Sequence, residues 1–228
     1  MHRYAIYFCP DDHTPLGTFG TEWLGRTSDG QELGPPALEH ISEPLWTAAT
    51  SAPRRYGFHA TLKPPFRLAA GVTEPDLHQA VEKFCQATPP VPLGRLTVEL
   101  LSEFIALRPE RNAPVNTFAE SCLQGFDRLR APSTAAEIAR RRPDTLTVRQ
   151  RNLLDRWGYP YVMDQFRFHM TLTGRLPSAE AQVFSAALET RFAPLLEQAV
   201  SIDSICILHQ ETPEDDFVLA GRYPLCGR

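Results

Sequence analysis

Two five-residue stretches decide the organisation of this sequence: Phe58-His59-Ala60-Thr61-Leu62 and Phe168-His169-Met170-Thr171-Leu172. Both read F-H-x-T-L. Side chains alternate along a β-strand, so the His and Thr of each stretch share one face, and the Phe and Leu share the opposite face. Each stretch is therefore predicted to be a strand with one buried face and one face lined by His and Thr. A single H-x-T is weak evidence, but the full pattern occurring twice, each time before a helical pattern, is far beyond chance.

The segments around the two motifs predict an α+β fold. Short runs rich in β-branched and aromatic residues indicate strands at residues 3–9, 57–62, 96–101, 104–108, 166–173, 202–209 and 217–223. Helical periodicity follows the capping residues Thr73, Thr134, Thr147 and Ser178, and a further helix is expected over about 118–129.

The order of these elements is repeated. A motif strand, a capped helix and further strands occur once in each half of the chain, which predicts two pseudo-symmetric lobes facing a central cleft. Each lobe is expected to hold a mainly antiparallel sheet with flanking helices. Residues 1–228 are thus expected to form a single bilobal domain. The arginine-rich segment at about 131–160 has no counterpart in the first half, so we interpret it as a helical insertion.

Composition narrows the classes of partner. The 228 residues are 43% hydrophobic and 22% charged, which is ordinary for a soluble globular protein. No apolar run approaches the roughly 20 residues of a membrane span, and the N-terminus enters a strand pattern directly, so no membrane partner is expected. Five scattered cysteines without a C-x-x-C pair favour a cytoplasmic location. The net charge of −4 disfavours nucleic acid, although eight arginines within residues 128–156 keep a nucleic-acid contact or a lid in consideration.

The duplicated motif suits general acid–base chemistry on a phosphate. Histidines near their usual pKa of about 6.5 can give or take a proton at neutral pH. In the opening of a cyclic phosphodiester, one neutral His takes a proton from water and the other, protonated, gives one to the leaving alkoxide. Thr61 and Thr171 would donate hydrogen bonds to the non-bridging oxygens. Two alternatives are a purely structural role and a metal site. No Asp or Glu stands two residues from either His, and Thr is a poor zinc ligand, so no metal or cofactor is expected.

At these residues the chain resembles the two-histidine (2H) phosphoesterase superfamily, whose signature is a pair of H-x-[ST] motifs. Within it, the sequence is similar to a branch of phosphonate-metabolism proteins, over blocks at residues 3–8, 23–26, 54–63, 140–143, 157–161 and 166–174. The resemblance implies a bilobal α+β fold and cofactor-free hydrolysis of a cyclic phosphate, with catalytic roles for His59, Thr61, His169 and Thr171. The branch implies a small substrate such as a phosphorylated ribose that carries a cyclic phosphate.

Four further residues are candidates for substrate binding. Tyr7 and Tyr56 are expected to hydrogen-bond phosphate or sugar. By strand parity, Lys63 shares the face of His59 and Arg167 that of His169, where either cation could hold a second phosphate.

Three function hypotheses follow. The first is a cyclic phosphodiesterase acting on a small sugar or nucleotide phosphate. The second is a phosphodiesterase or ligase-like enzyme that processes RNA ends with 2′,3′-cyclic phosphates. The third is a non-catalytic module that binds a phosphorylated ligand. The sequence leaves the oligomeric state open, and it also leaves open which histidine is the base.

Overall fold

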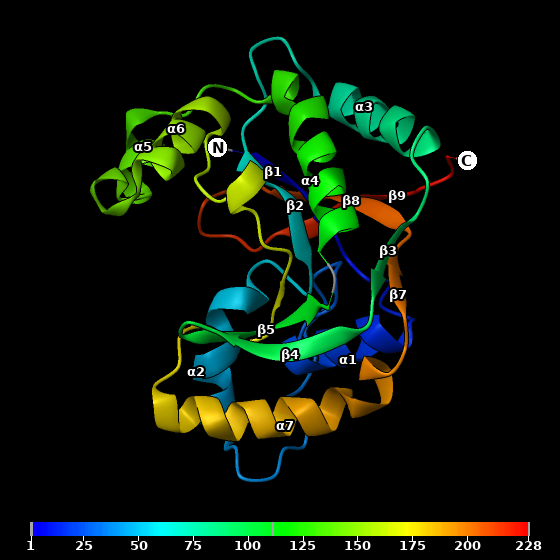
Figure 1. The fold of residues 1–228 in the computed structure, drawn as a ribbon, viewed down its shortest axis with the longest axis vertical. Coiled ribbons are helices and arrows are strands. Elements are labelled where there is room, and N and C mark those ends of the chain that lie inside the picture. Colours follow the sequence, from blue (N-terminus) through cyan, green and yellow to red (C-terminus); the bar gives the residue numbers. More distant parts are fainter. Residues whose placement is uncertain (1, 111, 228) are drawn as a thin grey trace.

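The main sheet is antiparallel and has seven strands. A computed structural model describes residues 2–110 and 112–227. The strand order is β4-β5-β6-β2-β1-β8-β9, and β3 and β7 form a separate two-stranded sheet (Figure 1). The strands are β1 (Arg3–Phe8), β2 (Ala60–Phe66), β3 (Val91–Gly94), β4 (Leu96–Leu101), β5 (Phe104–Pro109), β6 (Met170–Thr171), β7 (Val200–Ile202), β8 (Ser204–Gln210) and β9 (Val218–Pro224).

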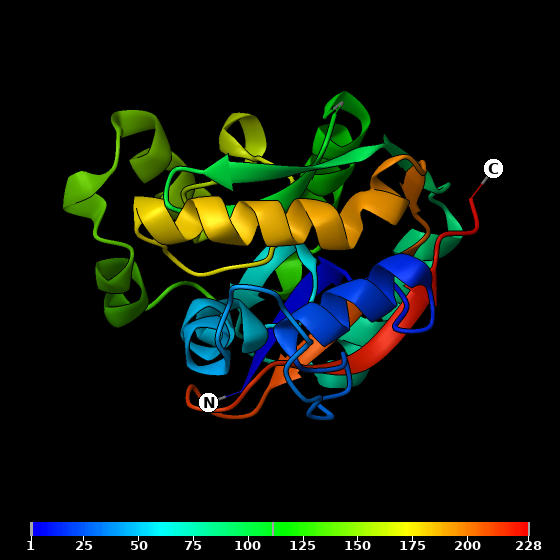
Figure 2. The same ribbon diagram turned by 90° about the horizontal axis from the view of Figure 1, so that it is seen from below.

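Helices cover this sheet at both ends. They are α1 (Pro15–Leu24), α2 (Glu43–Arg54), α3 (Glu74–Gln86), α4 (Ala113–Gly125), α5 (Ala135–Arg140), α6 (Val148–Trp157) and α7 (Ser178–Leu196). The long helix α7 packs along β4 and β5, whereas α4 lies against β2 and β3 and α3 against β8 and β9 (Figures 1 and 2). Helices α5 and α6, from the predicted insertion, project to one side of the body in Figure 1.

Both faces of the central strand β1 are buried. Tyr4, Ile6 and Phe8 point into the main hydrophobic core. The alternate residues Ala5 and Tyr7 belong to a second, smaller cluster that also contains Cys9, Cys206, Leu208 and Phe217. The face of the sheet on which Tyr7 lies is the one that carries the candidate site.

Several sequence predictions are confirmed. The fold is α+β with a large antiparallel sheet. Capping boxes start α3 at Thr73, α5 at Thr134 and α6 at Thr147, because each Thr accepts from a backbone N–H three residues later and the side chain at that position caps in return. Helix α7 starts at Ser178 as expected, but Ser178 is its first residue and not its cap, because Pro177 occupies the N-cap position without a side-chain hydrogen bond.

Other expectations differ from the structure. The expected strand at 166–173 is reduced to Met170–Thr171, because a short 3₁₀ turn (η3, Met163–Gln165) and an irregular segment precede it. Helices α1 and α2 and strand β3 were not expected. The two motif strands are neighbours in one continuous sheet, and the division into two lobes stays a prediction. Within the described residues, no helix is both long and apolar enough to span a membrane.

Candidate active site

The two motifs meet in the middle of the sheet. Ala60 of β2 pairs with Met170 of β6 in antiparallel register. This pairing places Thr61 opposite His169, and His59 opposite Thr171. The His and Thr side chains are half-buried, and the residues between and beside them are buried: Phe58, Ala60, Leu62, Phe168, Met170 and Leu172. The predicted alternation is confirmed, and both imidazoles and both hydroxyls lie on one face of the sheet.

Each imidazole is held by a backbone carbonyl two residues earlier. His59 Nδ1 lies 2.9 Å from the carbonyl oxygen of Gly57, and His169 Nδ1 lies 2.7 Å from that of Arg167. A carbonyl can only accept a hydrogen bond, so Nδ1 carries the proton in both rings. The two Nε2 atoms are thereby left for proton transfer, and His59 Nε2 lies 3.4 Å from the Thr61 hydroxyl. Gly57 has a φ of 70°, a conformation that suits glycine at this turn between α2 and β2.

The environment keeps both imidazoles neutral in the free protein at neutral pH. Burial lowers the pKa of His59 to about 4; the Gly57 carbonyl opposes this effect, and His169 nearby adds to it. Burial also lowers the pKa of His169, and the positive charge of Arg108 lowers it further. A bound phosphate anion would act in the opposite direction on both groups.

Aromatic side chains pack around His59. The Tyr7 ring stacks on the imidazole with centroids 3.9 Å apart and planes at 21°. Tyr56 lies at 6.0 Å from the imidazole in a tilted arrangement and stacks on Phe217. Tyr7 is only 1% exposed, and burial raises its pKa well above the usual value, so the phenol stays protonated. Both predicted tyrosines are therefore next to His59.

Helix α1 supports both motifs from behind. Gly20 of α1 faces the Phe58 ring so closely that an added Cβ would lie 2.0 Å from a ring carbon. One turn later, the Trp23 indole donates a 2.8 Å hydrogen bond to the carbonyl of Leu172. Trp46 of α2 donates in turn to the Trp23 carbonyl at 2.8 Å. The helix pair thus fixes the backbone on which both histidines depend.

A cavity of about 560 Å³, which we name the histidine pocket, opens beside these residues. Thr61 and Leu62 of the first motif and His169 of the second line it. Its other walls are mainly apolar and aromatic, with two arginines, and include Phe104, Arg108, Tyr159, Tyr161, Phe166 and Arg167. Tyr159 comes from the end of the insertion, which therefore contributes to this pocket.

Arg108 was not predicted from the sequence. Ala106 of β5 pairs with Thr171, so Arg108 lies opposite His169 in the next strand. Its guanidinium pairs with Glu99 at 2.7 Å and reaches the Phe168 carbonyl at 3.4 Å. The alternation of β5 around buried Ile105 and Leu107 was the available signal, but the pairing of β5 with β6 cannot be read from sequence alone.

The two predicted cations have different positions. Arg167 is exposed and lines the histidine pocket, with its guanidinium turned toward the carbonyls of Asp164 and Phe166. Lys63 does not share the face of His59, and that prediction is wrong. Strand β1 pairs Tyr7 with Thr61 but Ile6 with Lys63, so Leu62 is an extra residue that forms a β-bulge. The bulge turns Lys63 to the opposite face, where its ammonium lies 3.5 Å from Asp127.

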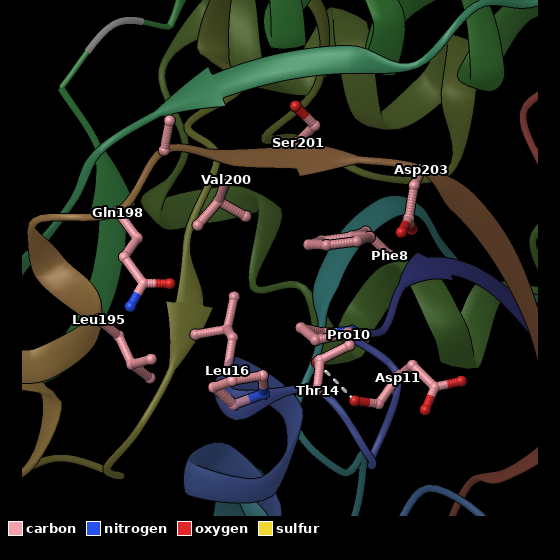
Figure 3. Close-up of a pocket in the computed structure, with 12 residues that line it drawn as sticks. Phe8, Pro10, Asp11, Thr14, Leu16, Leu195, Gln198, Val200, Ser201 and Asp203 are labelled. Carbon is pink, nitrogen blue, oxygen red and sulfur yellow. Dashed lines mark hydrogen bonds between the residues drawn. The ribbon is translucent and has the colours of Figure 1, made fainter.

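Another cavity, of about 160 Å³, lies where the loop after β1 meets the start of α1 and the segment between α7 and β7 (Figure 3). Phe8, Leu16 and Val200 contribute apolar walls, and Thr14 donates a hydrogen bond to the backbone of Asp11. No residue of either motif lines it. Among the residues that the structure describes, no group of three or more His, Cys, Asp or Glu side chains is arranged to hold a metal ion.

The class that this fold defines is an antiparallel α+β protein whose two H-x-T strands pair at the centre of the sheet. The chain belongs to the family described as "Protein of unknown function (DUF1045)", whose model matches residues 61–218.

Two curated relatives are both named ribose 1,5-bisphosphate phosphokinase PhnN. The relative from Janthinobacterium sp. (strain Marseille) is 41% identical over 239 residues, which cover 100% of this chain and 52% of the relative. The relative from Laribacter hongkongensis (strain HLHK9) is 34% identical over 205 residues, which cover 87% of this chain and 46% of the relative. The chain thus spans about half the length of the curated relatives it matches.

Proposed function

We propose that this protein hydrolyses a cyclic phosphodiester on a small sugar or nucleotide phosphate, with two histidines and without a metal ion. The observation that carries the proposal is the arrangement around the Ala60–Met170 pair. Two imidazoles and two hydroxyls share one face of the sheet, and both Nδ1 atoms are bonded to backbone carbonyls. Both Nε2 atoms are then available to move protons.

In the proposed reaction, His59 is the base and His169 the acid. The low pKa of His59, about 4, keeps its Nε2 unprotonated and ready to accept a proton from the attacking water. The water oxygen bonds to phosphorus, and the bond from phosphorus to one ring oxygen breaks. Substrate binding brings a negative charge that favours protonated His169, which gives its Nε2 proton to the leaving alkoxide. Thr61 and Thr171 donate hydrogen bonds to the non-bridging oxygens, and the product is a phosphomonoester.

The names of the relatives describe a kinase, and this chain lacks the sequence expected for a nucleotide-binding kinase loop. A phosphate-binding loop of the type G-x-x-x-x-G-K-[ST] needs a lysine after a glycine. The chain has only two lysines, Lys63 after Leu62 and Lys83 after Glu82. We infer that the kinase activity named in these relatives belongs to the half that this chain does not match. The matched half would perform another step on a ribose phosphate, in keeping with the resemblance to phosphonate-metabolism proteins.

A second candidate is the processing of RNA ends that carry a 2′,3′-cyclic phosphate. It is favoured by the aromatic wall of the histidine pocket, because single-stranded bases stack on such side chains. Phe104, Tyr161 and Phe166 lie on this wall. The chemistry at the histidines would be the same, so only the substrate separates the two candidates.

The experiment is a turnover assay with a chelator present. The panel comprises ribose 5-phosphate 1,2-cyclic phosphate, nucleoside 2′,3′-cyclic phosphates and a short RNA with a cyclic end. We expect turnover in wild type and a fall of about 10²- to 10⁴-fold in His59→Ala and His169→Ala. Dependence on an added metal, or activity equal to that of wild type in either variant, would overturn the mechanism. Ligand binding without turnover of any substrate would favour a binding module.

The acid and the base are separable by leaving group. In a substrate whose leaving oxygen is replaced by sulfur, the leaving group is a thiolate, which departs without being protonated. Such a substrate should therefore restore turnover in His169→Ala and not in His59→Ala. Restoration in His59→Ala alone would reverse the assignment.

A further inference from the structure

A second, strongly basic pocket lies next to the histidine pocket. We name it the basic pocket; its basic side chains are Arg3, Lys63, Arg67, Arg130 and Arg141, and its acidic one is Glu137. Arg67 forms a bidentate ion pair with Glu137. The Asp127 carboxylate lies 2.9 Å from Arg130 and 3.5 Å from Lys63. Five basic side chains thus face two carboxylates, which leaves an excess of positive charge.

Two of these cations have no carboxylate partner in residues 2–110 and 112–227. Arg3 hydrogen-bonds the neutral amide of Gln210 and lies over the Phe217 ring, 5.6 Å from its centre. Arg141 is exposed and lies over the Tyr159 ring at 4.6 Å. Guanidinium groups in this state present free N–H donors in the geometry that suits a phosphate.

Lys63 is the most informative residue of the pocket. Its side chain is 1% exposed, and its nearest acceptors are the Leu123 carbonyl at 3.4 Å and Asp127 at 3.5 Å. Both distances exceed the roughly 2.7–3.2 Å of a normal N–H···O bond. A buried ammonium is unfavourable unless it is well paired, so Lys63 has donor capacity that an anionic ligand would use.

The size and place of the pocket define the ligand. Its accessible space of about 50 Å³ is several times the roughly 10–15 Å³ that admits one water, so it admits a phosphate group but not a whole nucleotide. Pro64 lines both the basic pocket and the histidine pocket, and Gly158 of the first pocket precedes Tyr159 of the second. Thr61 of the histidine pocket and Pro64, which lines both pockets, are three positions apart in β2 on either side of the bulge at Leu62, so the two pockets are adjacent.

We propose that the basic pocket binds a phosphate group, and that during catalysis this group is a second, terminal phosphate of the cyclic-phosphate substrate. The second part rests on the proposed function. The first part does not, because a free phosphate ion has the same chemistry. Lys63 reaches the basic pocket from the face of β2 opposite His59, and Pro64 lines both pockets. A terminal phosphate held by Lys63, Arg3 and Arg141 would therefore place the cyclic phosphate of the same molecule on the other side of Pro64, at the two histidines.

The test has a binding arm and a kinetic arm. Binding of inorganic phosphate is measured by calorimetry for wild type, Arg141→Gln and Lys63→Met. The matched control is Arg140→Gln, an exposed neighbour that does not line the pocket. The kinetic arm compares kcat/KM for ribose 5-phosphate 1,2-cyclic phosphate with that for ribose 1,2-cyclic phosphate in the same four proteins.

We expect wild type and Arg140→Gln to bind phosphate and to prefer the substrate with the terminal phosphate. In Arg141→Gln and in Lys63→Met, the phosphate affinity and the preference for the substrate with the terminal phosphate should each fall by about 10- to 100-fold, which corresponds to the loss of one charge-assisted hydrogen bond. If wild type does not bind phosphate, or if both variants bind it as tightly as wild type does, the proposal that the basic pocket binds phosphate is wrong. Weakened phosphate binding with an unchanged substrate preference would overturn the link to the substrate. If no cyclic phosphate is turned over, the proposed function fails, and the binding arm still decides the pocket.

Discussion

Replacement of Lys63 by Met should stabilise the protein. The ammonium is buried beside Phe66 and Leu123 with only two long contacts. Burial lowers the pKa of Lys63 from 10.5 to about 8, although the charge of Asp127 opposes the change. This difference corresponds to about 3 kcal/mol of unfavourable free energy for the charged form at neutral pH. Met fills a similar volume without the charge, and Asp127 keeps its 2.9 Å contact with Arg130.

The sign of the pH dependence follows from the two pKa values. Between pH 8 and 10.5 the unfolded chain keeps the Lys63 proton and the folded protein loses it, so the free energy of unfolding rises with pH through this window. The penalty is full below pH 8 and absent above 10.5. Lys63→Met lacks this group, so its advantage over wild type should be about 1–3 kcal/mol at pH 7 and close to zero at pH 10.5.

The assay is urea unfolding of both proteins across this pH range, with phosphate-free buffers. Lys83→Met is the matched control, because Lys83 is the other lysine of the chain and is exposed. We expect it to differ from wild type by no more than about 0.5 kcal/mol at every pH. A Lys63→Met protein that is less stable than wild type at pH 7, or a difference independent of pH, would refute the reasoning.

Three further predictions concern the candidate site, and a fourth concerns the buried Arg26. Between pH 6.5 and about 4 only the unfolded chain protonates His59, so the wild-type free energy of unfolding should fall by at most about 3 kcal/mol as the pH is lowered through this window. His59→Asn should lack this part of the fall, which urea unfolding measured at a series of acidic pH values checks. Thr61→Val and Thr171→Val should each lower kcat by about 10²-fold with little change in KM, and exposed Thr190→Val should not; steady-state kinetics on a cyclic phosphate that wild type turns over measures this. Arg108→Gln should raise the pKa of His169, because it removes the nearby positive charge; NMR titration of the imidazole would show no change if Arg108 is too far to act. Arg26→Met should lower the free energy of unfolding by about 3 kcal/mol, because Arg26 is 3% exposed and donates hydrogen bonds to the carbonyls of Phe217 at 2.7 Å and Arg54 at 3.2 Å. The control is Arg95→Met, which removes an exposed ion pair and should lower it by less than about 1 kcal/mol in the same urea unfolding assay.

The local features of the fold were predictable from the sequence. Thr73, Thr134 and Thr147 each carry their partner three residues later, so the capping boxes depend on neighbouring residues alone. The burial of Phe58 and Leu62 follows from the period of a strand in the same way.

Features that depend on distant pairing were not predictable. The bulge at Leu62 exists because β1 pairs with β2 in a register that neither strand specifies alone, and it reverses the side on which Lys63 lies. Helix α1 was missed because Gly17 and Gly20 lower its helix propensity. Gly20 is needed where the helix touches the Phe58 ring, a contact between segments 38 positions apart.

The distribution of charge favours a small substrate over a nucleic acid. The net charge of −4 gives these 228 residues no net positive field that would attract a polyanion. Positive charge is instead concentrated in the basic pocket, where Lys63 is buried and Arg130 is largely enclosed. A polymer backbone binds cations along an exposed surface, whereas these cations are within reach only of a group small enough to enter beside Pro64. Because Lys63 is enclosed whereas Arg141 is exposed, Lys63→Met separates the two substrate classes: it should weaken the binding of a doubly phosphorylated sugar and leave the binding of a short RNA with a cyclic end unaffected.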